Sequence, residues 1–251
     1  MEDKRRKPME DRYTRIADYS PCRRIPNEKI MIQTGAILWD SQKKVSLIQL
    51  KFRNASGEAV KSVYVKLRLY DHENHLISFG GKQEIEADYI DVNVCPFSSF
   101  GEKTPVVVDS ELVRRIEAEV FRIVWKDGRV ENVSGECVDC SGQDILEEEK
   151  LLYQEACGIS EAKWKPRSLQ KYWQCTCGYL TDREECPACG AKKENLFYYQ
   201  SKEKLTEFQK GEENKRQREK ERKRKQEQKD KVLFLCVLAG ALLIGLLIRL
   251  S

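Results

Sequence analysis

The sequence predicts a mainly β protein: an antiparallel β-sandwich, followed by a helix, a small zinc ribbon, a charged helical stalk and one C-terminal transmembrane helix. Three observations lead to this fold class. The first half alternates apolar and polar residues, four cysteines follow in two close pairs, and an uncharged apolar run stands near the end. The expected divisions are a basic, poorly ordered segment at 1–28, the β-sandwich at 29–135, a helical connector at 136–168, the zinc ribbon at 169–200, the charged stalk at 201–231 and the transmembrane helix at 232–250.

Alternating runs in the first half predict strands with one solvated face. They are clearest at 45–54, 63–70 and 116–125, and the Asp127-Gly128 pair after the third run predicts a tight hairpin turn. Short strands separated by turns, without long helical patterns between them, predict an antiparallel sandwich with its own core. Apolar residues at helical spacing in 143–157 then predict the connector helix.

The sequence WQCTCGYLTDREECPACG holds the strongest chemical signal of the chain, two cysteine pairs that are each followed by glycine. Four thiolates suit tetrahedral zinc, and a glycine after each pair supplies the positive φ that a turn around the metal needs. The set leaves no coordination position for water, so one structural Zn²⁺ is expected, with a redox dithiol and unliganded thiols as alternatives. The predicted ligands are Cys175, Cys177, Cys186 and Cys189.

The CPACG motif resembles the metal-binding turn of zinc-ribbon modules, whereas the first pair departs from that pattern because a single residue separates its cysteines. The run ILWDSQKKVSLIQLKFRNASGEAVKSVYVKLRLYD resembles immunoglobulin-like sandwich domains of bacterial envelope-associated proteins. The whole order of elements is similar to that of tail-anchored zinc-ribbon membrane proteins of Gram-positive bacteria. This resemblance implies an architecture and no activity.

The apolar run VLFLCVLAGALLIGLLI at 232–248 predicts a membrane anchor. At 1.5 Å per residue it forms a helix of about 26 Å, which just spans a bilayer core of about 30 Å when Arg249 reaches the head groups. The alternative, a buried core helix, would need apolar partners that the preceding residues do not offer. Small residues four apart, which could let two such helices pack as a homodimer, are Cys236, Gly240, Ala241 and Gly245.

The charged run before the anchor orients it. Residues 215–231 carry ten Lys or Arg against four Asp or Glu, so the positive-inside rule predicts that the folded domains face the cytoplasm, at the cell membrane. No secretory leader is recognised at the N-terminus, which agrees with this side. The run itself fits a solvated single helix or a disordered linker equally well, and its net positive charge suits an anionic lipid surface.

No phosphate-binding loop, nucleophile elbow or open metal site is recognisable, so we expect a non-enzymatic protein. The prediction is a membrane-tethered cytoplasmic interaction or sensing protein with a protein partner that the sequence does not identify. The less favoured alternative is a membrane-held, nucleic-acid-binding zinc ribbon, suggested by aromatic and basic residues around the cysteines. Redox work by Cys137 and Cys140 is a third hypothesis, whereas His72 and His75 indicate a solvated turn.

Overall fold

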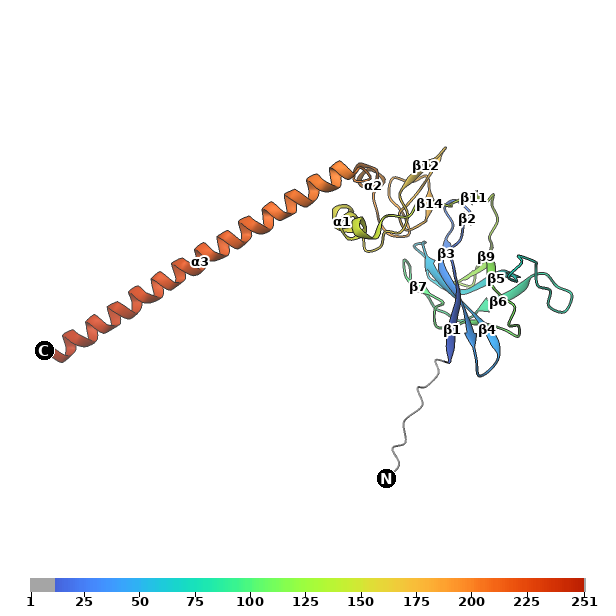
Figure 1. Cartoon of the computed structure of the whole chain (residues 1–251), viewed down its shortest axis with the longest axis horizontal. Helices are drawn as coiled ribbons and strands as arrows, with labels where there is room; N and C mark the ends of the chain where they lie inside the picture. The colour runs from blue at the N-terminus through green and yellow to red at the C-terminus, as the bar shows by residue number, and fades with distance from the viewer. Residues whose placement is uncertain (1–11, 251) are drawn as a thin grey trace, which may run out of the picture. The chain divides into compact units, whose positions relative to one another are not determined.

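The computed structural model of the chain describes residues 12–250, with side chains for residues 12–231. It is mainly β, with antiparallel sheets and a C-terminal helix, as predicted (Figure 1). The chain divides after Gln200 into two compact units. The strands are β1 (Tyr13–Tyr19), β2 (Arg23–Arg24), β3 (Ile30–Asp40), β4 (Val45–Asn54), β5 (Val60–Tyr70), β6 (Ile85–Tyr89), β7 (Ser99–Phe100), β8 (Val106–Val108), β9 (Arg115–Trp125), β10 (Val130–Asn132), β11 (Val138–Asp139), β12 (Arg167–Leu169), β13 (Tyr172–Gln174) and β14 (Leu180–Thr181), and the helices are α1 (Glu147–Cys157), α2 (Lys193–Tyr198) and α3 (Lys202–Leu250).

Two antiparallel sheets enclose one hydrophobic core, and we call residues 12–133 the two-sheet domain. One sheet has the order β1-β3-β4-β7 with β8 also paired to β4, and the other has the order β10-β9-β5-β6. The alternation predicted for β4 is confirmed, since every second residue of that strand is buried. Largest among the fully buried core side chains of the two sheets are Ile30, Ile37, Ile48, Leu50, Phe52, Leu67, Leu69, Tyr89 and Trp125.

An aromatic cluster closes the core beside β7. The ring of Phe52 packs edge-on against Tyr89 at 4.8 Å and stacks on Phe100 at 5.0 Å between centroids. Gly101 follows with φ +95°, and a Cβ there would lie 2.5 Å from the ring of Phe52. Only glycine therefore lets the chain turn over this ring.

The first sheet begins earlier than the sequence predicts. Instead of a poorly ordered segment at 1–28, the structure places β1 along β3 and pairs β2 with β11; residues 1–11 lie outside the described part of the chain. The run YTRIADY has few apolar residues and is exposed along most of its length, so it carried no clear strand signal. Backbone hydrogen bonds with β3 hold this strand in the sheet, because its mostly exposed side chains bury little apolar surface.

The β1 end of the domain is held by an ion pair between Arg12 and Asp40, 2.7 Å apart. Hydrogen bonding from this guanidinium, followed by backbone N–H groups, lowers the pKa of Asp40 from 3.8 to about 2. A depressed carboxyl pKa stabilises the fold above pH 3.8, and that contribution is lost as pH falls through about 2. An Arg12→Gln variant should raise the pKa of Asp40 measured by NMR and move the acid loss of stability to higher pH; an unchanged pKa would contradict this assignment.

Between the two-sheet domain and the cysteines the chain forms α1, which confirms the predicted connector helix in shortened form. Three glutamates, Glu147 to Glu149, occupy its first turn, where the helix dipole favours negative charge. Gly158 ends it in the left-handed conformation, and the N–H of Ile159 donates to Gln154 O at 3.1 Å.

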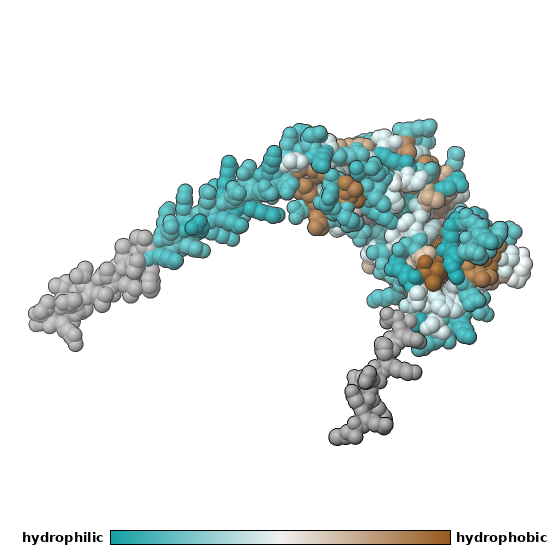
Figure 2. Space-filling view, viewed as in Figure 1, coloured by the Kyte–Doolittle hydropathy of each residue, from teal (hydrophilic) through white to brown (hydrophobic). Residues whose placement is uncertain are grey.

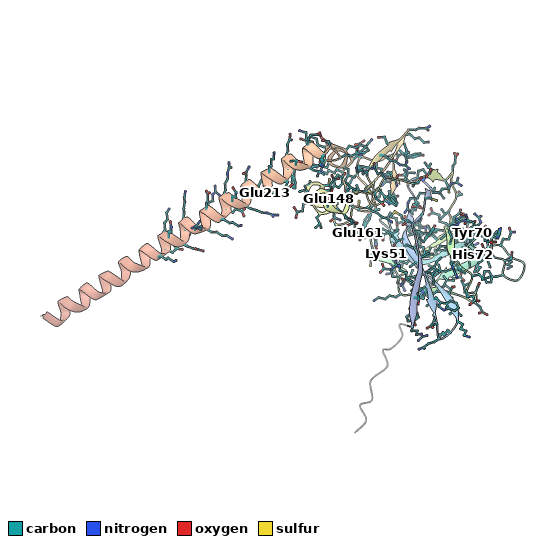
Figure 3. The ribbon with its side chains drawn as sticks, viewed as in Figure 1. Lys51, Tyr70, His72, Glu148, Glu161 and Glu213 are labelled. Atoms are coloured by element: carbon teal, nitrogen blue, oxygen red, sulfur yellow. The ribbon has the colours of Figure 1, made fainter. Side chains whose placement is uncertain are left out.

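The C-terminal helix α3 runs for 49 residues from Lys202 to Leu250, so the helical alternative for the stalk describes its backbone. Beyond Phe208 its described side chains are hydrophilic (Figure 2), and Glu213 is one of them (Figure 3). Within residues 12–231, whose side chains are described, no helix is both long and apolar enough to cross a membrane. The predicted span at 232–250 and its small residues Cys236, Gly240, Ala241 and Gly245 lie outside those described side chains.

Candidate metal centre

The four predicted ligands stand on two turns that differ in length. In the first, which β13 and β14 flank, the N–H of Gly178 donates to Cys175 O at 2.8 Å, three residues back. In the second, the N–H of Gly190 donates to Cys186 O at 2.8 Å, four residues back. The first turn is thus one residue tighter, which explains how a pair with a single intervening residue can still face its counterpart.

Both glycines have the positive φ that the sequence predicted, +89° at Gly178 and +74° at Gly190. Further bonds close the turns: the N–H of Cys175 donates to Tyr179 O at 2.8 Å, and that of Cys186 to Ala191 O at 2.9 Å. A residue with a Cβ is disfavoured in this backbone region, so glycine is the residue that fits. The two glycine-ended turns therefore aim all four thiols at one point.

The four Sγ atoms lie within 4.8 Å of one another. Cys175 and Cys189 are 3.5 Å apart, and Cys177 and Cys186 are 3.7 Å apart, so each close contact joins the first turn to the second. Sulfurs held about 2.3 Å from a tetrahedral ion would be separated by about 3.8 Å. A disulfide would require about 2.05 Å. The spacing is that of a metal-binding set of thiols.

The cluster cannot hold four negative charges by itself. Burial is the main cause that raises the pKa of Cys175, whereas hydrogen bonds from the other thiols, that of Cys175 first, lower the pKa of Cys189. The thiolate is therefore favoured at Cys189, whereas Cys175 and Cys177 retain their protons unless a divalent cation takes the protons' place. Within the described residues no other group of three or more metal-ligating side chains comes together.

The turns are packed against the two-sheet domain, and we call residues 167–198 the cysteine module. The hydroxyl of Tyr179 donates to Glu28 O at 2.7 Å, and the N–H of Asn27 donates to Leu180 O at 2.8 Å. From the other side of the site, Arg53 Nε donates to Ala188 O at 3.0 Å. Each cysteine-bearing turn is therefore hydrogen-bonded to a loop or strand of the two-sheet domain.

Arg24, which is 5% exposed, lies between these parts. Its guanidinium pairs with Glu28 at 2.8 Å and donates to Ile32 O at 2.8 Å, and it lies close enough to Gly178 that a Cβ there would be 3.6 Å from it. Sequence reasoning missed this residue, because it stands in a stretch with the composition of a solvated basic tail. Only the pairing of β2 with β11 shows that it is buried.

Two of the aromatic residues beside the cysteines, Trp173 and Tyr179, belong to the core of the module. Trp173 is 1% exposed and Tyr179 is 2% exposed, and the indole N–H of Trp173 donates to Arg183 O at 2.6 Å. Phe197 packs edge-on against Trp173 at 6.3 Å between centroids. The buried rings of Trp173 and Tyr179 are therefore not available to stack on bases, whereas Tyr198 is exposed.

Cys137 and Cys140 do not join the cluster. Burial raises the pKa of Cys140 to about 11 and also raises that of Cys137. The thiolate is the nucleophilic form, so both groups are poorly reactive at neutral pH. This favours the interpretation as ordinary structural or free thiols over redox chemistry.

The two histidines stand in an exposed turn after β5, where His72 lies close to Tyr70 (Figure 3). The carboxylate of Asp71 accepts the backbone N–H groups of Glu73 and His75, both at 2.9 Å, and so holds the turn. The imidazoles are mostly solvated, as the sequence indicates.

Comparisons with protein-family models, with curated proteins and with solved structures found no match for the chain.

Proposed function

We propose that the chain is a non-enzymatic, membrane-tethered interaction or sensing protein, in which a β-sandwich and a structural zinc ribbon form one cytoplasmic platform. The observation that carries this proposal is the closed set of four thiols packed against the two-sheet domain. Four sulfurs fill a tetrahedral shell and leave no position for substrate or water. Such a site supports a fold and performs no hydrolysis.

Zinc is the metal that we assign. A tetrahedral set of four thiolates is typical of Zn²⁺ or of an iron–sulfur centre, and glycine-ended turns around a single point fit one ion. The module has three short strands and a six-residue helix, so its apolar core is small. Apparent zinc-binding free energies of about 10–16 kcal/mol exceed what such a core supplies, and folding and metal binding therefore coincide.

The membrane part of the proposal rests on the apolar run at 232–248 and on the basic residues before it. In helical form, residues 202–231 would hold the platform up to about 45 Å from the bilayer. Their net positive charge favours the cytoplasmic, anionic side of the membrane. Tethering raises the local concentration of whatever the platform binds at the membrane, which is the benefit expected for a recruiting or sensing role.

Membrane fractionation tests the anchor. The full chain should sediment with membranes and resist alkaline carbonate, because a spanning helix is not released by breaking ionic contacts. A chain that ends at Lys231 should be soluble. As a matched control, an Arg218→Gln, Arg222→Gln and Lys225→Gln variant should stay in the carbonate-resistant fraction; its release would mean that charge alone holds the protein at the membrane.

Crosslinking tests the platform. Photocrosslinkers placed at exposed positions of the two-sheet domain in intact membranes should capture the same protein repeatedly. The capture should be lost in a Cys186→Ser, Cys189→Ser variant that remains membrane-bound, because the folded module packs against the two-sheet domain. Capture that is equally strong without the metal site would contradict a joint platform.

A further inference from the structure

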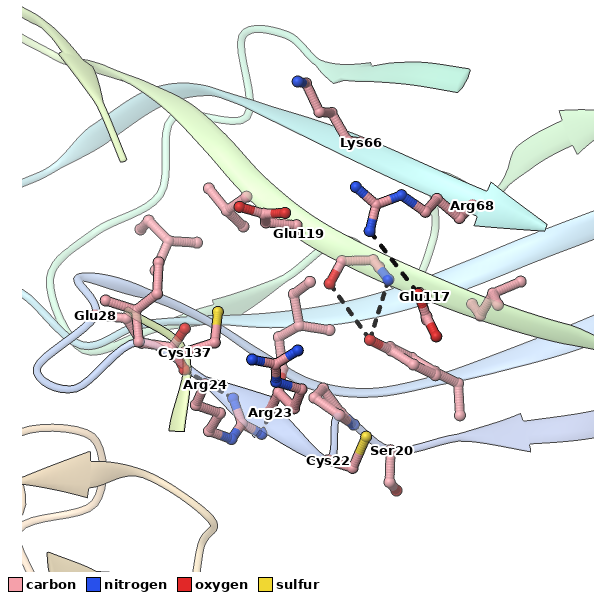
Figure 4. A pocket seen from close by; sticks show the side chains of 18 of the residues that line it. Ser20, Cys22, Arg23, Arg24, Glu28, Lys66, Arg68, Glu117, Glu119 and Cys137 are labelled. Atoms are coloured by element: carbon pink, nitrogen blue, oxygen red, sulfur yellow. Dashed lines mark hydrogen bonds and ion pairs between the residues drawn. The ribbon is translucent and has the colours of Figure 1, made fainter. Parts of the chain in front are cut away.

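A cavity of about 440 Å³ opens where the two sheets diverge, between β9 and the β1–β2 segment (Figure 4). Its inner wall is apolar and includes Ile30 and Ile32 from one sheet and Val120 from the other. Charged side chains surround its mouth. The volume falls within the range of roughly 300–1,000 Å³ that is usual for small-molecule sites, and an apolar interior with a few polar groups is their common composition.

The structure closes this cavity to an added β-strand. β10 pairs with β9 at residues 122–124, and the N–H of Val133 donates to Phe121 O at 2.9 Å, so the outer edge of β9 is open only before Phe121. The hydroxyl of Tyr19 covers that edge: it accepts the N–H of Ala118 at 3.2 Å and donates to Ala118 O at 3.4 Å (Figure 4). A peptide strand would have to displace these bonds, so a small molecule is the occupant that fits.

Most charges around the mouth neutralise one another. Arg115 pairs with Glu117 at 2.8 Å, and the buried pair of Arg24 and Glu28 forms part of the floor. Two cavity-lining residues of opposite charge, Arg23 and Glu119, pair through their backbones in the sheets, but their side chains make no hydrogen bond or ion pair within the described part of the chain.

The side chains of Arg23 and Glu119 both influence the pKa of one thiol, that of Cys137. Arg23, Glu119 and Cys137 all line this cavity (Figure 4). After burial, which raises the pKa of Cys137, the charge of Glu119 raises that pKa and the charge of Arg23 lowers it. The cavity therefore presents a cation and an anion together, above an apolar interior. The ligand complementary to this arrangement carries a carboxylate, an ammonium group and an apolar part.

We propose that this cavity binds a free α-amino acid with a large apolar side chain. Arg23 binds the carboxylate, Glu119 binds the ammonium group, and the side chain enters between the sheets toward Ile30 and Val120. A guanidinium suits a carboxylate because it offers paired donors. This site does not depend on the membrane anchor and would supply a signal for the sensing role.

Isothermal titration of the purified full chain tests the class of ligand. L-leucine and L-phenylalanine are expected to bind, and each lost feature should weaken binding at least about tenfold, as is usual when a charged hydrogen-bond partner is removed. The analogues are 4-methylpentanoate, which lacks the ammonium group, 3-methylbutylamine, which lacks the carboxylate, and glycine, which lacks the apolar part. Absence of binding by both amino acids at millimolar concentration, or equal binding of the analogues, would overturn the proposal.

Variants then assign the two charges. Arg23→Gln should bind leucine and 3-methylbutylamine alike, because the group that reads the carboxylate is gone. Glu119→Gln should bind leucine and 4-methylpentanoate alike. Lys61→Gln and Glu86→Gln replace exposed residues of β5 and β6 outside the cavity and should bind as the parent does. Unchanged discrimination in the first two variants, with unchanged urea midpoints, would refute the assignment.

Discussion

Replacement of Cys189 by serine is expected to unfold the cysteine module while the core of the two-sheet domain stays folded. Serine is a poor zinc ligand, and the remaining three thiols cannot close the tetrahedral shell. With the loss of a site worth about 10–16 kcal/mol in apparent binding, the small core around Trp173 is too weak to stay folded. The expected readouts are loss of bound zinc and a red-shifted tryptophan fluorescence.

Cys95→Ser is the matched control for this experiment. Cys95 is exposed in the two-sheet domain, outside the thiol cluster. Its replacement should leave zinc content and fluorescence unchanged. A Cys189→Ser chain that retains full zinc and a native spectrum would show that Cys189 is not a ligand.

Arg24→Met should be the most costly single change outside the metal site, with a loss of about 3–5 kcal/mol in the free energy of unfolding. It leaves Glu28 buried without its counter-charge and Ile32 O without its donor. Burial already raises the pKa of Glu28 from 4.5, and Arg24 opposes that shift. Without the arginine the folded pKa rises further, so the destabilisation should grow as pH increases above 4.5 and diminish below it.

The double variant Arg24→Met, Glu28→Gln separates charge burial from loss of packing. It should recover part of the lost stability, because a neutral amide costs less to bury than an unpaired carboxylate. Arg122→Met, an exposed change on β9, should shift the urea midpoint little. If Arg24→Met behaved like Arg122→Met, the buried ion pair would not join the two parts of the fold.

The sequence predicted well the features that depend on local patterns of residues. A period of two marks β4, β5 and β9 because one face of each is buried and the other is solvated. The thiol cluster was predictable because both turns carry their ligands and their glycine within a few residues. Even the shorter first pair converges, since a tighter turn compensates for the missing residue.

The features that it did not predict depend on contacts between distant residues. β1 is mostly exposed, so its side chains show no apolar period, and only its pairing with β3 identifies it. The segment that holds Arg23 and Arg24 has a basic composition, yet one arginine is buried beside the module and the other lines a cavity. No periodicity distinguishes these two neighbours, because their roles follow from packing with chain more than a hundred residues away.

X-ray absorption at the zinc edge, together with metal content of the purified full chain, tests the metal centre most directly. We predict one zinc per chain with four sulfur neighbours at about 2.3 Å. Substoichiometric metal after expression with sufficient zinc, or nitrogen or oxygen neighbours in place of sulfur, would contradict a closed structural site formed by Cys175, Cys177, Cys186 and Cys189.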